Sequence, residues 1–128
     1  MKNLKKVLSL ALVLVMACGL FVTASASDYT DSSNINYQTA VDVLSGVGIL
    51  EGYADGSFLP KGDVNRAQAA KIVAYLLLGK ESADALSTNV SPFADVPAGH
   101  WAAGYIQYCA NQGIIDGVGN NLFKPTNK

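Results

Sequence analysis

The sequence has 128 residues, half of them hydrophobic, with nine basic and ten acidic residues and a formal net charge of −1. This length allows at most one ordinary domain. After the first 26 residues, six basic residues face ten acidic ones without forming a cluster, which argues against nucleic acid as a partner because a phosphate backbone needs grouped cations.

The first 26 residues have the order of a secretory signal peptide. A lysine-rich start precedes an apolar run at 7–22, and Ala24-Ser25-Ala26 supplies small residues for cleavage after Ala26. An uncleaved membrane anchor is the less favoured interpretation, because a spanning helix needs about 20 apolar residues. A lipoprotein signal with Cys18 as the lipidated residue is a second alternative, which Met16 disfavours. We therefore expect a secreted protein with no membrane contact after cleavage.

The remaining chain contains two copies of one sequence pattern, displaced by 65 residues. The residues that match between the copies are Gly48 and Gly113, Ile49 and Ile114, Gly52 and Gly117, Phe58 and Phe123, and Pro60 and Pro125. An earlier block at 29–31 corresponds to 93–95 at an offset of 64. A constant offset indicates stacked repeat units, and the spacing of apolar residues predicts a unit of helix, ordered loop and helix. The expected fold is therefore mainly α.

The first predicted helix covers residues 37–47, where apolar residues fall at helical spacing. Asn36 can cap its start, and Gly48 can end it in a left-handed conformation. We expect a short buried extended segment at 49–50 next. A turn should follow at 54–57, in which Gly56 adopts a positive φ.

A second helix is predicted from Arg66 to residue 78. Asn65 and Gln68 have the form of a capping box, in which each side chain bonds the other residue's backbone N–H, and Gly79 ends the helix. Its apolar stripe indicates a core helix. One further helical turn is expected within 81–88, with Ser82 as its cap.

The second copy opens at Phe93, and its helix is predicted to begin at His100-Trp101 and to end at Gly113. Cys109 takes the place of Leu44, so a small buried hydrophobe is favoured over a reactive thiol. Because the chain stops at Lys128, we expect the second copy to lack its second helix. The apolar face that should then lack part of its cover consists of Ile106, Cys109, Ile114, Ile115 and Phe123.

Five blocks in this order resemble the S-layer homology repeat. The blocks are Phe93-Ala94-Asp95-Val96, His100-Trp101-Ala102, 113–117 (Gly-Ile-Ile-Asp-Gly), Phe123-Lys124-Pro125 and, in the first copy, Asn65-Arg66-Ala67-Gln68. The resemblance implies a secreted bacterial module, usually of three repeats in a pseudo-threefold bundle. It further implies binding to a secondary cell-wall polysaccharide that carries ketal-pyruvate groups, with other S-layer proteins as further partners. On this basis we expect a signal peptide at 1–26, repeat 1 at 27–80, a linker at 81–92 and a truncated repeat 2 at 93–128.

The resemblance implies polysaccharide-binding roles for Arg66, Trp101, Gln68 and Asp95. A pyruvate ketal is a carboxylate on a sugar, which calls for a cation with paired donors and a flat apolar surface; Arg66 and Trp101 are of these types. Free N–H groups at the helix start should assist Arg66. From the residues alone, Arg66 can also be a solvated charge, Trp101 a packing residue and Asp95 a loop-stabilising acceptor.

The sequence departs from the family pattern at two places. Asn65 and Gln68 stand where the usual helix-opening motif has Thr and Glu, which keeps the capping chemistry but removes one charge beside Arg66. The first copy has Ile35-Asn36 where the second has His100-Trp101, so a tryptophan-lined subsite is expected only once.

Nothing in the sequence favours an enzyme. After the leader there is one histidine and one cysteine, and no serine lies in a nucleophile-elbow setting. His100 has no partner at metal-ligand spacing, and Asp55 and Asp63 lack the pattern of a calcium loop. We expect a non-catalytic anchoring module at the cell wall or S-layer, without metal or cofactor. The alternative is a protein-interaction or S-layer assembly module that binds no glycan.

Overall fold

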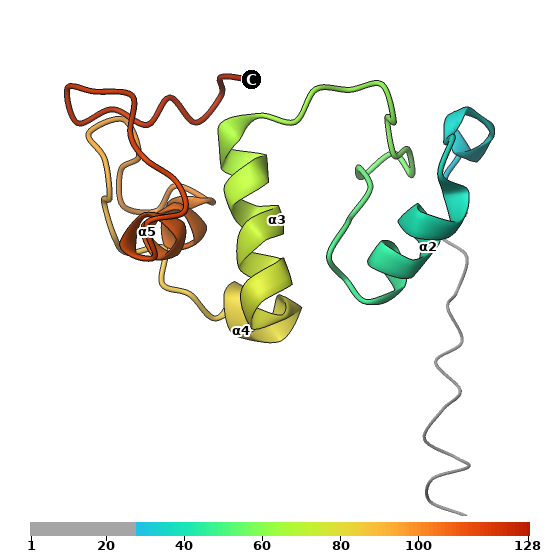
Figure 1. Cartoon of the computed structure of the whole chain (residues 1–128), viewed down its shortest axis with the longest axis horizontal. Helices are drawn as coiled ribbons and strands as arrows, with labels where there is room; N and C mark the ends of the chain where they lie inside the picture. Colours follow the sequence, from blue (N-terminus) through green and yellow to red (C-terminus); the bar gives the residue numbers. More distant parts are fainter. Residues whose placement is uncertain (1–27) are drawn as a thin grey trace, which may run out of the picture.

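The computed structural model describes residues 28–128, so the predicted signal peptide and its alternatives lie outside the described residues. This part of the chain is mainly helical and contains no β-strand (Figure 1). Its elements are the 3-10 helix η1 (Ser32–Asn34) and the α-helices α2 (Gln38–Gly46), α3 (Arg66–Leu78), α4 (Lys80–Asp84) and α5 (Ala103–Asn111). Within 28–128, no helix has both the length and the apolar character needed to cross a bilayer.

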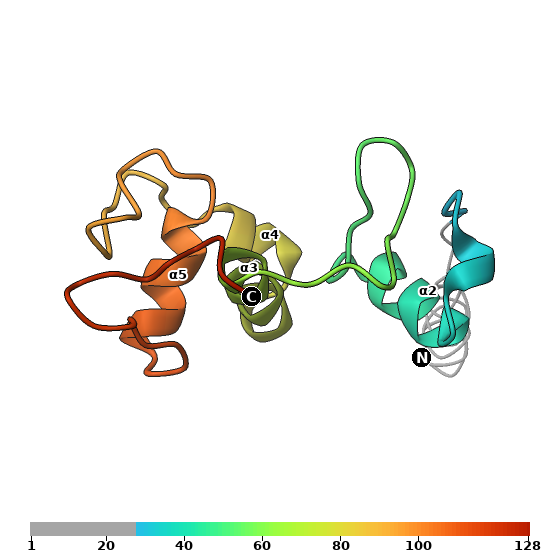
Figure 2. The same cartoon turned by 90° about the horizontal axis from the view of Figure 1, so that it is seen from above.

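Helix α3 lies at the centre of the arrangement. Figure 1 shows α5 and the second-copy loops on one side of α3, and α2 with its long loop on the other. Seen from above in Figure 2, α3, α4 and α5 form one group, to which a single extended segment connects the first-copy loop and α2. The second helix of the first copy therefore packs against the first helix of the second copy.

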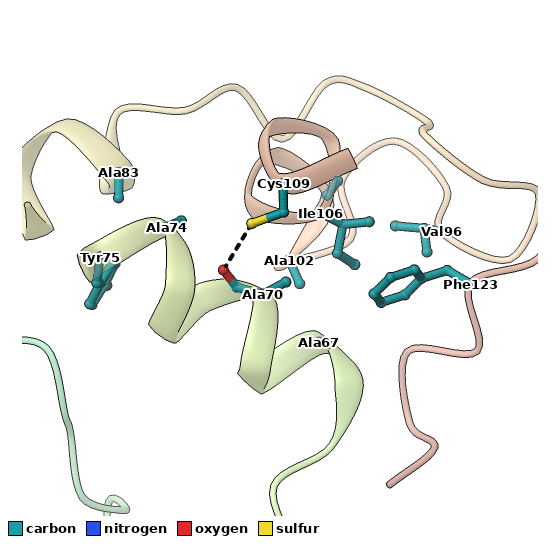
Figure 3. Close-up of a cluster of buried hydrophobic side chains, with 11 residues drawn as sticks. Ala67, Ala70, Ala74, Tyr75, Ala83, Val96, Ala102, Ile106, Cys109 and Phe123 are labelled. Atoms are coloured by element: carbon teal, nitrogen blue, oxygen red, sulfur yellow. Dashed lines mark hydrogen bonds between the residues drawn. The ribbon is translucent and has the colours of Figure 1, made fainter. Parts of the chain in front are cut away.

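The core is the contact between α3 and α5. Ala67, Ala70 and Ala74 recur about once per turn of α3, and their side chains are buried against Ile106 and neighbouring second-copy residues (Figure 3). Small side chains on α3 leave room for the larger ones opposite, so the two helices can pack closely.

Cys109 belongs to this core. Its side chain is fully buried, and its thiol donates a hydrogen bond of 3.5 Å to the carbonyl oxygen of Ala70. Burial raises the pKa of the Cys109 thiol. The prediction of a small buried hydrophobe is confirmed.

The prediction that the second-copy apolar face lacks cover is wrong for most of that face. Ile106, Cys109 and Phe123 are 0% exposed, and Ile115 is half-buried. The cover is α3 of the first copy, which the sequence argument had assigned to its own repeat. Only Ile114 remains open, with 46% of its surface exposed.

Helix α3 begins and ends as predicted. The Asn65 side chain accepts from the Gln68 N–H at 2.9 Å, and the Gln68 side chain accepts from the Asn65 N–H at 2.9 Å, so the capping box is complete. Gly79 follows the last turn with a φ of 76°.

Three predicted helix starts are wrong. Helix α2 begins after Tyr37 and has no side-chain cap, so Asn36 does not cap it. Helix α4 begins at Lys80, directly after Gly79, which places Ser82 inside the helix. Helix α5 begins at Ala103, because His100 and Trp101 lie in a preceding turn where His100 Nδ1 accepts from the Ala102 N–H at 3.1 Å.

The two ordered loops repeat each other closely. Tyr53 N–H donates to the Ser57 carbonyl at 2.8 Å, and the equivalent Val118 N–H donates to the Leu122 carbonyl at 2.7 Å. The turn predicted at 54–57 is confirmed, with a φ of 82° at Gly56. The segment 49–50 is half-buried rather than fully buried, so that prediction holds only in part.

Candidate functional site

A groove of about 360 Å³ lies between the first-copy loop and the first two turns of α3. The loop contributes apolar side chains, among them Ile49, Leu59 and Pro60. The α3 wall carries Gln68, Lys71 and Ile72, and Trp101 of the second copy stands at its edge. The groove thus combines apolar walls with a few polar groups, which is the usual composition of a small-ligand site.

Trp101 is the aromatic platform of this groove. Its side chain is 49% exposed, and its ring stacks on the His100 ring with centroids 5.8 Å apart at 26°. A half-exposed indole held by a neighbouring ring offers a flat apolar face to a ligand. This exposure does not fit the alternative in which Trp101 is only a packing residue.

Gln68 also lines the groove. Its side-chain oxygen is used by the capping box, where it accepts from Asn65 N–H. The side-chain amide nitrogen has no hydrogen-bond partner within residues 28–128, so it remains available as a donor.

Arg66 lies on the other side of the helix start and does not line the groove. Its Nε donates to the Phe123 carbonyl at 2.8 Å, and its Nη2 donates to the Asp116 carbonyl at 2.6 Å. The guanidinium carbon stands 4.4 Å from the centroid of the Phe123 ring. Arg66 therefore holds the second-copy loop against the start of α3.

The backbone N–H groups at the start of α3 already have hydrogen-bond acceptors within the chain. The Arg66 N–H donates to the Asn127 carbonyl at 2.8 Å, and the Ala67 N–H donates to the Pro125 carbonyl at 3.0 Å. The third, from Gln68, is bonded within the capping box. The prediction of free N–H groups beside Arg66 is therefore wrong, because the last residues of the second copy occupy them.

Asp95 holds the same second-copy loop from its other side. Its two carboxylate oxygens accept from Phe123 N–H at 2.8 Å and from Lys124 N–H at 2.7 Å. These bonds lower the pKa of Asp95 and fix Lys124 at a φ of 56°. Asp31 makes the equivalent pair of bonds in the first copy. Asp95 thus has the loop-stabilising contacts that the sequence also allowed.

The four predicted site residues therefore form two pairs. Gln68 and Trp101 both line the groove. Arg66 and Asp95 meet at Phe123, where one bonds its carbonyl and the other its N–H.

Sequence reasoning missed three charged residues of the groove, Lys71, Glu51 and Asp63. Lys71 Nζ lies 2.6 Å from Glu51 Oε2, and Lys80 Nζ lies 2.6 Å from the other Glu51 oxygen. Hydrogen bonds from these lysines lower the pKa of Glu51. A signal existed, since an acidic residue follows the apolar pair in both copies, but nothing in the sequence indicated its partners.

The ion pairs continue away from the groove through Lys80. Its Nζ also lies 2.9 Å from Asp84 Oδ2, and the hydroxyls of Tyr75 and Tyr105 both donate to Asp84 Oδ1. The bond from Tyr75 and the contact with Lys80 lower the pKa of Asp84 to about 2. This network joins the first-copy loop to α3, α4 and α5.

Comparison with known proteins identifies one family. The S-layer homology domain matches residues 28–70 and 92–128. A cell surface protein of Thermoanaerobacter kivui is 35% identical over 133 residues, which cover all of this chain and 17% of that protein.

Two proteins of Acetivibrio thermocellus are also similar. Cell surface glycoprotein 1 is 41% identical over 96 residues, which is 71% of the chain and 4% of that protein. A cellulosome-anchoring protein is 36% identical over 76 residues, which is 59% of the chain and 17% of that protein. The chain thus spans less than a fifth of each of these relatives. No solved structure matches it.

Proposed function

The chain belongs to the S-layer homology family, and on this premise we propose that it is an anchoring module of the bacterial cell wall or S-layer. Domains of this family are non-catalytic anchoring modules. The relatives named for the cell surface and for cellulosome anchoring support this role. A similar xylanase does not change it, because the chain corresponds to only 8% of that enzyme.

The ligand we propose is a secondary cell-wall polysaccharide that carries ketal-pyruvate groups. The observation that supports it is the groove lined by both the half-exposed Trp101 ring and Gln68, whose side-chain amide nitrogen has no hydrogen-bond partner within residues 28–128. One sugar ring would lie on the indole face, while the amide would donate to a sugar oxygen.

Arg66 enters this proposal in a second place. Its Nε and one Nη2 hydrogen are committed to carbonyl oxygens, but Nη1 has no partner within 28–128. That outer edge can pair with a carboxylate without loss of the existing bonds. Asp95 supports it indirectly, since it fixes Phe123 and Lys124 beside the guanidinium.

Sedimentation with cell walls tests the proposal. The chain should sediment with walls that contain pyruvylated polysaccharide and much less with the same walls after mild acid has removed the pyruvyl groups. Trp101→Ala should weaken binding by about tenfold, because the loss of an aromatic stacking surface worth about 1.4 kcal/mol corresponds to a tenfold change in affinity. Tyr37→Ala is the matched control for glycan binding, because Tyr37, the residue before α2, is 79% exposed and does not line the groove. Equal binding to treated and untreated walls would contradict the ligand.

The alternative function, an assembly module without glycan binding, has its own supporting observation. Helix α2 exposes an apolar face on which Tyr37 is 79%, Val43 50% and Val47 54% exposed. At the offset of 65, the equivalent positions are covered in part: Ala102 is buried and Tyr108 of α5 is half-buried, whereas Gln112 is exposed. A helix of another repeat, from an S-layer protein, could cover α2 in the same way.

The first-copy loop agrees with this alternative. In the second copy, four carbonyl oxygens accept hydrogen bonds from Arg66 and Ala67 at the start of α3. At the offset of 65, the equivalent carbonyl groups of the first copy are those of Glu51, Phe58, Pro60 and Gly62. None of these four accepts a hydrogen bond within residues 28–128. If assembly is the function, Val43→Asp should abolish association with S-layer proteins, and pyruvyl removal should have no effect.

A further inference from the structure

Lys71 is the one cation among the groove-lining residues that the structure describes. Arg66, the cation that the family resemblance indicated, points to the second-copy loop instead. A carboxylate on a sugar that lies over Trp101 would therefore meet Lys71 first. The groove also contains Glu51 and Asp63, so an anionic ligand has to enter against two acidic side chains.

In the structure Glu51 forms an ion pair with Lys71. The two side chains are 2.6 Å apart, and they are 42% and 28% exposed, so solvent and ligand can reach the pair. Burial lowers the pKa of Lys71, but the hydrogen bond that its ammonium donates to Glu51, together with the charge of Glu51 and the contact with Tyr75, raises this pKa overall. The Nζ also stands 5.1 Å from the Tyr75 ring centroid, which holds it in place.

Glu51 has a second cation outside the groove. Lys80 Nζ contacts its other oxygen at 2.6 Å and is not among the lining residues. If Glu51 releases Lys71, it therefore keeps one ion pair. Breaking an ion pair is costly when it leaves a charge without any partner, whereas the cost is small when the charge keeps a second partner.

We propose that Lys71 binds the carboxylate of an anionic sugar, and that Glu51 is the internal competitor which the ligand displaces from it. This inference rests on the proposed polysaccharide function and assigns the residue that selects the ligand. A neutral sugar has no carboxylate that could take the place of Glu51 beside the Lys71 ammonium group. The Glu51–Lys71 pair therefore makes the groove selective for carboxylated over neutral sugars.

The proposal predicts opposite effects for the two partners. Lys71→Met should weaken binding of the pyruvylated polysaccharide by about tenfold, because a charge-assisted hydrogen bond is lost, and should leave the depyruvylated form unaffected. Glu51→Gln removes the competitor and keeps the shape, so it should strengthen binding of the pyruvylated form by roughly threefold or more. A purely structural role would not give this gain.

The experiment is a titration of the chain with each form of the isolated polysaccharide, followed by the fluorescence of Trp101, the only tryptophan. Lys61→Met is the matched control, because Lys61 lies in the same loop but does not line the groove. Lys71→Arg should retain the preference for the pyruvylated form. Equal circular dichroism and urea midpoints would show that each variant is folded.

Two results would overturn the inference alone. One is a Glu51→Gln variant that binds the pyruvylated form no better than the unchanged chain does. The other is a Lys71→Met variant that loses affinity equally for both forms, which would mean that Lys71 only shapes the groove. If the unchanged chain binds neither form, or both equally, the proposed ligand fails first and the inference fails with it.

Discussion

Replacing Arg66 by alanine should destabilise the fold, whatever ligand the chain binds. The change leaves the Phe123 and Asp116 carbonyls without their guanidinium donor and removes the cation above the Phe123 ring. Hydrogen bonds to charged groups contribute roughly 1.5 to 3 kcal/mol each, and a cation over an aromatic ring adds about 0.5 to 1 kcal/mol. Because Arg66 is half-buried, we take the lower part of these ranges.

The expected loss in free energy of unfolding is therefore about 3.5 to 4.5 kcal/mol. With a urea dependence of about 1 to 3 kcal/mol per M, the midpoint should fall by roughly 1 to 4.5 M. Arg66→Lys keeps the charge but can reach only one carbonyl well, so it should lose about half as much. Urea unfolding followed by Trp101 fluorescence and far-ultraviolet circular dichroism measures both variants.

Lys61→Ala is the control for this measurement, since Lys61 is exposed and makes no hydrogen bond within 28–128. It should change stability by less than about 0.5 kcal/mol. The reasoning is refuted if Arg66→Ala unfolds at the same urea concentration as the unchanged chain. In that case the contacts with the second-copy loop contribute nothing, and a loss of wall binding alone would make Arg66 a ligand residue.

Three other outcomes are expected. Gly117→Ala should cost about 1 to 3 kcal/mol in urea unfolding, because its Cβ would lie 2.7 Å from Phe93 Cε1; an unchanged midpoint would contradict this. Folding lowers the pKa of Asp84 from 3.8 to about 2, so the contribution of Asp84 to the free energy of unfolding is complete above pH 4 and is lost as the pH falls toward 2. Asp84→Asn should therefore reduce the dependence of stability on pH between pH 4 and 2. An unchanged dependence in urea unfolding would contradict the role of this network. Cys109 should react with a thiol reagent only in urea, since it is buried with a raised pKa, and rapid labelling without urea would disprove that burial.

Features that depend on neighbouring residues could be predicted from the sequence. The capping box of Asn65 and Gln68 needs only a spacing of three residues, and the glycine turns need only a local positive φ. The start of α5 was missed although it is local. His100 directly precedes a run of apolar residues at helical spacing, so it looks like the first residue of that helix. In the structure its ring nitrogen accepts a hydrogen bond from the Ala102 N–H and so stabilises a turn there.

The groove was only half predictable. Trp101 and Gln68 were predicted as binding residues from the family resemblance, and both line the groove. Lys71 was missed because its function depends on Glu51, which lies 20 residues earlier in a loop whose path the sequence does not give. Without that path, a lysine on a helix is indistinguishable from any solvated charge.

The packing partner of α3 explains why the contacts of Arg66 with the second copy could not be predicted from the sequence. The stripe of Ala67, Ala70 and Ala74 indicates that a partner helix comes close, but it does not identify that partner, because small residues fit many surfaces. Assigning α3 to its own repeat left Arg66 at an open helix end, where a ligand was the natural partner. In the structure α3 packs on α5, and Arg66 reaches carbonyls 50 and 57 residues away. The packing unit is therefore formed between the two copies. Arg66 at the start of α3 stabilises the contact between them through its hydrogen bonds to second-copy carbonyl groups. Arg66 does not line the groove, so among the described lining residues Lys71 supplies the positive charge.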